Sequence, residues 1–538
     1  MRFSFAILCI VSAATSQGGM PPLPVPAQNP ITPQKAILGK LLFWEEQMSS
    51  NNRIACGTCH TFAAGGGDLR RSVHPGPDGI TPSPDDKFGS PGIVRSNANN
   101  EYTIDPTFGL DEQVTPRAAP SFLTAAWFPK LFWDGRATTA FIDPQTNQTT
   151  IPVDGALESQ AIGPILASNE MAHDGRQWSD VLTKLQSATP MALASNLPPD
   201  MTAAIGGGET YPDLFQAAFG TPTITAQRIA YALATYQRTL IPDQTPWDHH
   251  MNGQQGAMTP QQINGWNIFN GPARCSLCHT PGLFSDGQFR NLGLRPIQED
   301  NGRQGITNNF ADRGKFKVPS LRNVGLRQSQ MHDGSFTSLQ QVYTFYLNGG
   351  GAFTDNKDPL LVPLNVPGAV VPDLIEFITN ALTDPRVAAG QHPFDRPTLH
   401  SDVMSPSGYP YGVGTAGTGG RSPELLAAVP ANLGNVDFKV GISNARGGAM
   451  AAMAVAAIPG TGTTVGANLN VQLNSALIFY VGLAGVTASP GAGYGTVMLT
   501  VPHNPALSGI TLYAQGFVFD VGATAGLASS GGAEIRLF

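Results

Sequence analysis

Two short strings of the form Cys-x-x-Cys-His are the residues of this chain best suited to do chemistry. They comprise Cys56, Cys59 and His60 in the first copy and Cys275, Cys278 and His279 in the second. In this pattern the two thiols form thioether bonds to haem vinyl groups, and the histidine binds the iron. A single copy is also compatible with a dithiol redox motif or with half of a zinc site.

The setting of the two copies favours haem over these alternatives. Zinc would need both copies to meet in one site, yet most of a domain's length separates them in the sequence. A dithiol redox motif sits between a strand and a helix, whereas the approach to the first copy, Leu38 to Trp44, has an amphipathic helical pattern. We therefore predict two covalently bound haem c groups.

The remaining cysteine, Cys9, lies in an apolar run that follows Arg2 and ends in small residues near Ser16. This order is typical of a secretory signal peptide, and the run is shorter than the ~20 residues that a membrane-spanning helix needs. We expect a periplasmic or secreted protein with no transmembrane segment. A formal net charge of -7 argues against nucleic acid as a partner.

The elements that carry the two strings are predicted to be short helices joined by long loops, because 61 glycines and 45 prolines punctuate the chain. The clearest helix runs from Thr225 to Leu240. After residue 435 charges become rare, and runs such as Gly495 to Val501 and Ile510 to Val521 indicate strands. The predicted fold class is mainly α, with two c-type cytochrome domains with long loops followed by a C-terminal all-β, sandwich-like domain.

The expected domain division follows from these shifts in composition. It is a signal peptide (1–16), a Pro-rich lead-in (17–33), an N-terminal cytochrome domain (34–255), a C-terminal cytochrome domain (256–399), a linker rich in Gly, Ser and Pro (400–435) and a β-domain (436–538). The two cytochrome units share a weak local sequence similarity, because Met171 to Gly175 resembles Met331 to Gly334. We interpret this similarity as evidence of internal duplication.

Several further strings occur in a fixed order along the chain. They are Leu38 to Phe43, Phe132 to Arg136, Tyr211 to Phe215, Tyr236 to Leu240, Phe289 to Gly293 and Lys317 to Asn323. With these strings and the two haem motifs, roughly residues 30 to 400 resemble the bacterial dihaem cytochrome c peroxidase family, including its MauG branch. The resemblance implies that the N-terminal haem reacts with hydrogen peroxide and that the C-terminal haem handles electrons.

The resemblance also assigns residues around the first haem. Gln160 and Glu170 match the distal pair of the family, and Glu170 is the candidate acid/base group for cleavage of the O–O bond. The alternative for Glu170 is a surface glutamate at the start of a loop. Trp133 matches the tryptophan held between the haems, where it relays an electron, although core packing alone would also explain it. Arg136 and Arg322 are expected to pair with haem propionates.

The ligand of the second haem is the most informative departure from the peroxidase branch. The position that carries methionine there is Tyr346 in this chain, as in the MauG branch, where tyrosinate completes the iron coordination. Met331 is the competing ligand, and an ordinary packed helix tyrosine is the third alternative. A thioether would raise the haem potential, whereas a phenolate would lower it.

Two more departures concern the first haem and calcium. His74 lies near the place of a family histidine that binds iron in the resting enzyme, but at a different spacing and in a Pro/Gly-rich insertion. It is expected to be either a ligand or a loop residue. The family's calcium site uses an asparagine where this chain has Ala118, so Ca²⁺ binding is in doubt.

The sequence thus predicts an oxidoreductase that reduces hydrogen peroxide with electrons relayed between two haems. The external donor would be a small cytochrome or a cupredoxin. One alternative is a MauG-like enzyme that uses peroxide to oxidise a partner protein or another substrate. Another is a non-enzymatic electron carrier, which would need neither Gln160 nor Glu170 beside its iron.

Overall fold

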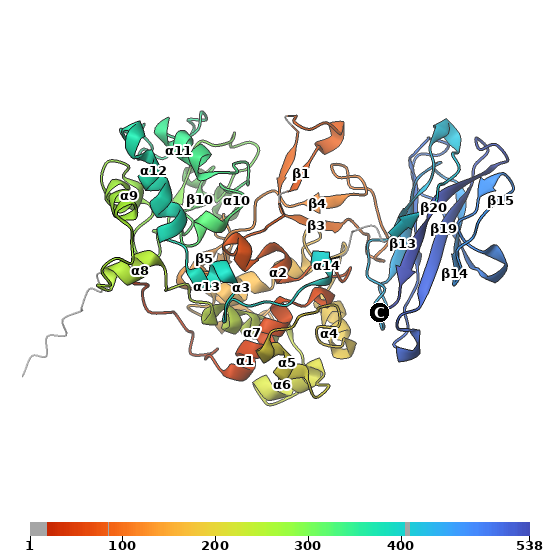
Figure 1. Cartoon of the computed structure of the whole chain (residues 1–538), viewed down its shortest axis with the longest axis horizontal. Helices are drawn as coiled ribbons and strands as arrows, with labels where there is room; N and C mark the ends of the chain where they lie inside the picture. Colours follow the sequence, from red (N-terminus) through yellow and green to blue (C-terminus); the bar gives the residue numbers. More distant parts are fainter. Residues whose placement is uncertain (1–18, 71, 84, 404–408) are drawn as a thin grey trace, which may run out of the picture.

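The computed structural model describes residues 19–538 except 71, 84 and 404–408. Two helix-containing regions and a β-rich region lie along the long axis of the molecule, with the N-terminal helical region in the middle (Figure 1). The predicted signal peptide, residues 1–16, lies outside the described residues. Within the described part, no helix combines the length and the apolar character needed to cross a membrane.

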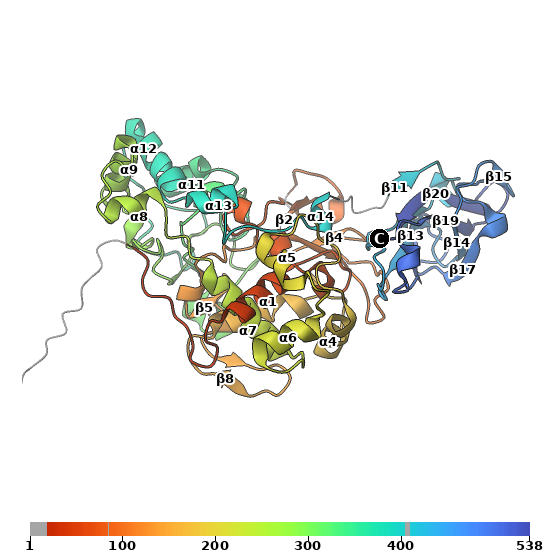
Figure 2. The same cartoon turned by 60° about the horizontal axis from the view of Figure 1, so that its bottom comes forward.

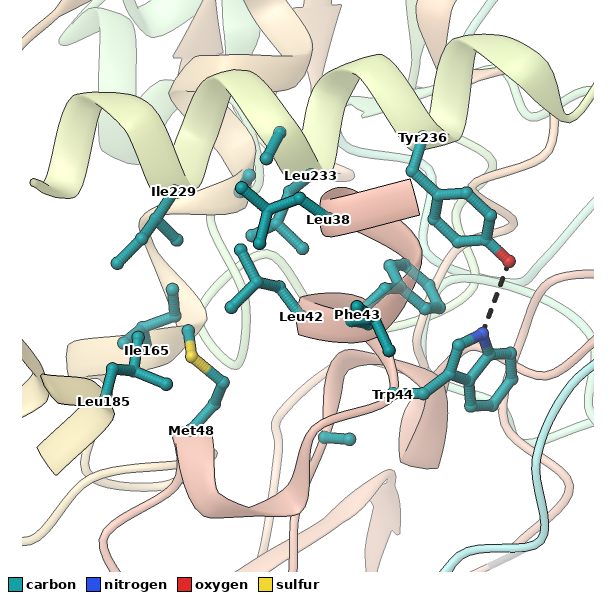
Figure 3. Close-up of a cluster of buried hydrophobic side chains, with 14 of the residues drawn as sticks. Leu38, Leu42, Phe43, Trp44, Met48, Ile165, Leu185, Ile229, Leu233 and Tyr236 are labelled. Atoms are coloured by element: carbon teal, nitrogen blue, oxygen red, sulfur yellow. Dashed lines mark hydrogen bonds between the residues drawn. The ribbon is translucent and has the colours of Figure 1, made fainter. Parts of the chain in front are cut away.

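The first region is built around the crossing of α1 and α7, and side chains of both helices lie in its core. Its helices are α1 (Pro33–Phe43), α2 (Cys56–Cys59), α3 (Ala156–Ala161), α4 (Trp178–Ser187), α5 (Pro199–Ile205), α6 (Tyr211–Phe219) and α7 (Ala226–Thr239). Thr32 is the N-cap residue of α1, because its hydroxyl accepts a hydrogen bond from the backbone N–H of Lys35. The apolar side chains of α1, including Leu38 and Leu42, pack against α7 (Figure 3).

A glycine sets how closely α1 and α7 approach. A Cβ atom on Gly39 would lie 1.9 Å from the carbonyl oxygen of Ala232, which is far inside van der Waals contact. At the far end of the pair, the indole Nε1 of Trp44 donates to the hydroxyl of Tyr236 at 3.3 Å (Figure 3). The helix pair therefore fixes the chain that leads directly into the first haem motif.

The second region repeats this arrangement with different helices. They are α8 (Pro246–Met251), α9 (Pro260–Asn270), α10 (Gln304–Thr307), α11 (Leu339–Leu347) and α12 (Val371–Glu376). The last two helices, α13 (Pro385–Ala389) and α14 (His400–Val403), return to the first region and pack against it. In α9, a Cβ atom on Gly265 would lie 2.0 Å from the carbonyl oxygen of Asp373 in α12. Each haem motif therefore follows a helix, α1 or α9, in which a glycine allows close packing against the partner helix.

The prediction of a mainly α fold is wrong, because 29% of the residues are helical and 19% are in strands. Among the described residues, five two-stranded hairpins lie within the two helical regions. They are β1/β2 (Ser72–His74, Lys87–Gly89), β3/β4 (Pro91–Val94, Glu112–Val114), β5/β6 (Lys130–Leu131, Ala137–Thr138), β7/β8 (Phe141–Ile142, Thr149–Ile151) and β9/β10 (Phe289–Arg290, Phe316–Lys317). Strands of two to four residues are too short to show an alternating pattern, so tertiary contacts determine them.

The C-terminal region is a sandwich of two antiparallel sheets. Its strands are β11 (Tyr409–Tyr411), β12 (Glu424–Leu426), β13 (Lys439–Ala445), β14 (Met450–Ala456), β15 (Thr463–Thr464), β16 (Ala467–Asn468), β17 (Leu477–Gly482), β18 (Gly493–Met498), β19 (Thr511–Phe519) and β20 (Leu527–Arg536). One sheet has the order β11-β20-β19-β14-β17 and the other β12-β13-β18. Side chains such as Val440, Met453 and Val518 fill the space between the sheets. The strands β11 and β12 come from the stretch 400–435 that the composition predicts to be a linker.

The β-domain, residues 409–538, contacts the first region on the side of β3 and β4 (Figures 1 and 2). Lys184 of α4 forms a 2.8 Å ion pair with Asp437. The backbone N–H of Tyr102, in the loop between β3 and β4, donates to the hydroxyl of Thr496 in β18 at 2.9 Å. The contact therefore joins the β-domain to the same region that carries the first haem motif.

Candidate active site

Two cavities of similar size, about 190 Å³ and 220 Å³, lie in the helical regions. The first is lined by Cys56, Cys59 and His60, and the second by Cys275, Cys278 and His279. Each Cys-x-x-Cys-His string therefore faces a cavity of its own. A zinc site shared by the two strings would need the cysteine pairs together, and the structure keeps them in separate cavities.

The two histidines have the same hydrogen-bonding arrangement. The Nδ1–H group of His60 donates to the carbonyl of Gly66 at 3.1 Å, and that of His279 donates to the carbonyl of Phe284 at 3.0 Å. This bond fixes the ring and leaves Nε2 as the nitrogen that can bind iron. Burial lowers the pKa of both imidazoles, which favours the neutral form that a metal needs.

The cysteine environments suit thioethers better than thiolate ligands. Burial raises the pKa of Cys56 and of Cys275 to about 12, so both sulfurs are uncharged near neutral pH. A thioether carries no charge and tolerates such apolar surroundings. The residues present therefore fit two covalently attached haem groups.

Two cationic side chains without carboxylate partners also suit bound haem. Lys317 and Arg327 line the second cavity, and Lys317 lines the first as well. No carboxylate of the described residues forms an ion pair with either side chain, and burial lowers the pKa of Lys317 to about 8 and that of Arg327 to about 10. Haem brings two propionate carboxylates, which such cations would bind.

The predicted distal residues Gln160 and Glu170 lie on the wall of the first cavity. Among the described residues, neither side chain has a hydrogen-bond partner, so both are available to a ligand in the cavity. Burial raises the pKa of Glu170, while the guanidinium of Arg136 acts in the opposite direction. The position of Glu170 at the cavity differs from the surface loop of the alternative interpretation.

Trp133 lies between the two cavities and contributes to the walls of both. Its side chain is 7% exposed, and its indole Nε1 donates to the carbonyl of Ala118 at 2.8 Å. Three further residues line both cavities: Lys317, Pro319 and Ser320. The backbone N–H of Lys317 donates to the carbonyl of Trp133 at 2.7 Å, so the shared wall is held together by its main chain.

Both candidate ligands of the second haem, Tyr346 and Met331, line the second cavity. Tyr346 is near the end of α11, and burial raises the pKa of its hydroxyl. Met331 has a positive φ of 69°, which is uncommon for a residue with a side chain. The wall of this cavity thus presents a phenol and a thioether together.

Arg136 and Arg322, the two predicted propionate partners, have different positions. Arg136 lines the first cavity, where its Nη1 is 3.0 Å from a carboxylate oxygen of Asp134. Arg322 lines neither cavity and forms a buried ion pair with Asp248 at 2.7 Å. Its guanidinium therefore holds α8 within the second region.

His74 also lies outside both cavities. It is the last residue of β1, where Nδ1 accepts a hydrogen bond from the backbone N–H of Gly76 and Nε2 lies 3.5 Å from Asp111. Near Ala118, the position that departs from the family's calcium site, the guanidinium of Arg117 pairs with Asp134 at 2.6 Å and with Asp300 at 2.7 Å.

Sequence reasoning missed Lys317 as a cavity residue. The sequence does contain a signal for a role of Lys317, because this lysine is the first residue of the string Lys317 to Asn323 that contributes to the resemblance. Composition does not show that a lysine will be buried without a partner. That property depends on two regions of the chain meeting at one wall.

Comparison with known proteins agrees with this geometry. Residues 33–256 match the family model described as di-haem cytochrome c peroxidase. Cytochrome-c peroxidase IdrP1 of Pseudomonas sp. (strain SCT) is 29% identical over 422 residues, which cover 72% of this chain and 89% of that protein. Methylamine utilization protein MauG of Methylophilus methylotrophus is 29% identical over 326 residues, which cover 60% of this chain and 75% of that protein.

A solved structure shows the same fold. It is that of a MauG-like protein associated with microbial copper homeostasis, which is 24% identical and has a TM-score of 0.50, with 71% of this chain and 97% of that chain covered. The relatives carry the names of cytochrome-c peroxidases and of MauG, which are oxidoreductases. Two cavities with haem-attachment motifs, a family match over residues 33–256 and relatives from both branches lead to one conclusion: this chain is similar to the dihaem cytochrome c peroxidases and to MauG.

Proposed function

We propose that this protein reduces hydrogen peroxide in the His60 cavity with electrons that enter at the His279 cavity and pass by Trp133. The observation that carries the proposal is the pair Gln160 and Glu170, which line the first cavity with unbonded polar groups. Bound haem would supply the redox centre for cleavage of the O–O bond. Two electrons and two protons then convert one hydrogen peroxide into two waters.

Glu170 is proposed to move the proton that this reaction needs. As a carboxylate it would accept a proton from the peroxide oxygen nearer the iron and return it to the outer oxygen, which leaves as water. Gln160 would orient the peroxide through its side-chain amide. Because the carboxyl group lies in an apolar wall, water does not compete strongly for the proton.

The test of this role is Glu170→Gln, which keeps the shape of the side chain and removes the base. We expect kcat/KM for peroxide to fall by about a hundredfold or more. Glu424→Gln is the matched control, because Glu424 is an exposed residue of β12 in the β-domain. Unchanged peroxide turnover in Glu170→Gln would refute the acid/base role.

Electrons are proposed to come from a small redox protein, a cytochrome or a cupredoxin. The exposed apolar side chains Leu277, Leu360 and Val362 line the second cavity and form a patch at its surface. Such a patch would let the donor approach the second haem closely. We further propose that this takes place in the periplasm or outside the cell, as the expected signal peptide implies.

Tyr346 favours a second candidate function, the peroxide-dependent oxidation of a partner protein or another substrate in the manner of MauG. A tyrosinate ligand would lower the potential of the second haem and let it hold oxidising equivalents. Magnetic circular dichroism of the oxidised protein distinguishes the two ligands. A thioether signal that disappears in Met331→Leu would exclude Tyr346 and favour simple peroxide reduction.

A further inference from the structure

The segment that bears Glu170, residues 167–176, is held by main-chain hydrogen bonds and by the buried side chains of Met171 and Arg176. The backbone N–H of Glu170 donates to the carbonyl of Ala167 at 3.0 Å, and the amide of Gln113 donates to the carbonyl of Ser168 at 2.7 Å. The carbonyl of Met171 accepts from the backbone N–H of Ser50 at 2.8 Å. Since the Glu170 carboxylate has no partner among the described side chains, the position of this segment determines where the carboxylate lies.

A second loop, residues 95–102 between β3 and β4, supports this segment from outside. The carbonyl of Ser96 accepts a hydrogen bond from the backbone N–H of Asp174 at 2.8 Å. The guanidinium Nε of Arg95 lies 3.1 Å from the carboxylate of the same aspartate. The 95–102 loop and the Glu170 segment are therefore joined through both backbone and side chain.

One lysine of the β-domain enters the 95–102 loop. The ammonium of Lys439, the first residue of β13, donates to the hydroxyl of Ser96 at 2.8 Å and to two oxygens of Asn100, the carbonyl at 2.6 Å and Oδ1 at 2.8 Å. It also lies 4.2 Å from the ring centroid of Tyr102. Lys439 is 1% exposed, so all three ammonium protons have partners in a region from which water is excluded.

The chemistry of this contact is specific. All three acceptors are uncharged oxygens, and a buried ammonium is costly unless each donor is satisfied. The contact therefore requires the 95–102 loop to keep the conformation that presents these oxygens. Nothing about sandwich stability requires a lysine to point out of the β-domain into another region.

We propose that the β-domain positions the acid/base group of the first cavity, with Lys439 as the positioning residue. The chain of contacts runs from Lys439 to Ser96, from Ser96 to Asp174, and along the backbone to Glu170. This inference rests on the proposed role of Glu170. It gives the C-terminal domain a function in the peroxide reaction that does not depend on a partner.

The test compares Lys439→Met with Arg536→Met in the full-length protein loaded with both haems. Methionine keeps the unbranched shape and most of the length of the lysine side chain but cannot donate a hydrogen bond. Arg536 is an exposed cation on β20 of the same domain. We expect kcat/KM for peroxide to fall between about tenfold and a hundredfold in Lys439→Met, because small displacements of a reacting group are costly. With the dye ABTS as reductant, KM for the dye should stay at the value of the unmodified protein.

Hydrogen exchange supplies a readout that is independent of turnover. In Lys439→Met, amides of residues 95–102 and also 167–176 should exchange faster, whereas Arg536→Met should leave both segments unchanged. Faster exchange confined to the 95–102 loop, or unchanged peroxide kinetics, would overturn the proposal. Should Lys439→Met fail to fold, Ser96→Ala removes one acceptor from the other side and is expected to show the same effects in weaker form.

The two proposals can fail separately. If Glu170→Gln keeps full activity while Lys439→Met still loosens residues 167–176, the acid/base role is refuted and the mechanical connection remains. If Glu170→Gln is inactive and Lys439→Met behaves like the unmodified protein, the role of the β-domain is refuted and the reaction chemistry remains.

Discussion

At the scale of single residues, the electrostatics of the first cavity make a prediction about pH. Among the described residues, Arg136 is the charge that stabilises ionised Glu170 against the effect of burial. Arg136→Gln should therefore raise the pKa of Glu170 further. Because the proposed reaction needs the carboxylate, the loss of kcat/KM for peroxide as pH falls should begin at a higher pH. Arg536→Gln serves as the control, and a shift in the opposite direction would contradict the assignment.

Lys317 leads to a second residue-scale prediction. A buried cation beside both cavities favours the reduced form of any haem bound there, because reduction removes positive charge from the iron. Lys317→Met should lower both haem potentials by an amount on the order of tens of millivolts. Redox titration monitored by absorbance measures this. The control is Lys130→Met, which removes an exposed cation of β5 and should leave both haem potentials unchanged.

Sequence motifs predict the family resemblance of this chain well, but they predict the contacts of single residues less well. The resemblance to dihaem cytochrome c peroxidases and MauG is confirmed, because the two haem strings and the ordered motifs are local and specific. Gln160, Glu170 and Trp133 line cavities, and their catalytic roles stay predictions. Arg322 shows why a motif does not determine a contact: its guanidinium has an equally suitable partner in Asp248, which the sequence does not reveal.

At the scale of helices and strands, the crossing of α1 and α7 makes a stability prediction. Gly39→Ala would place a methyl group 1.9 Å from a carbonyl oxygen, so the two helices must separate. We expect a loss of about 3 kcal/mol in the free energy of unfolding. Urea unfolding followed by circular dichroism measures it.

The control for this substitution is Gly305→Ala in α10, where a new Cβ atom would meet no heavy atom within 4 Å. It should be neutral or slightly stabilising, because alanine favours a helix. Equal stability of the two variants would show that the α1–α7 crossing can relax without cost.

The error in fold class also belongs to this scale. Long helices such as α7 have a clear apolar period, whereas hairpins such as β5/β6 contain two residues per strand. Their pairing depends on tertiary contacts that the sequence pattern does not reveal. The β-domain was foreseen because its strands are longer and its charges few, and a C-terminal β-domain is seen. Its first strands lie in a stretch whose composition resembles a linker.

At the scale of the whole molecule, the apolar patch at the second cavity predicts how a donor binds. Leu360→Ser combined with Val362→Ser should raise KM for a small c-type cytochrome as donor by about fivefold. Turnover with a small dye should not change, because a dye needs no extended surface. Val521→Ser is the control, since Val521 is 82% exposed in the β-domain. An unchanged KM would place the donor elsewhere.

The wall between the cavities has a consequence for how this protein could evolve. Trp133 comes from the first helical region, whereas Lys317, Pro319 and Ser320 come from the second, and all four touch both cavities. Neither region therefore encloses a whole cofactor site by itself. Recombination that exchanged one region for that of a distant relative would alter both sites at once. The two halves must be inherited together, despite the duplication that their motifs suggest.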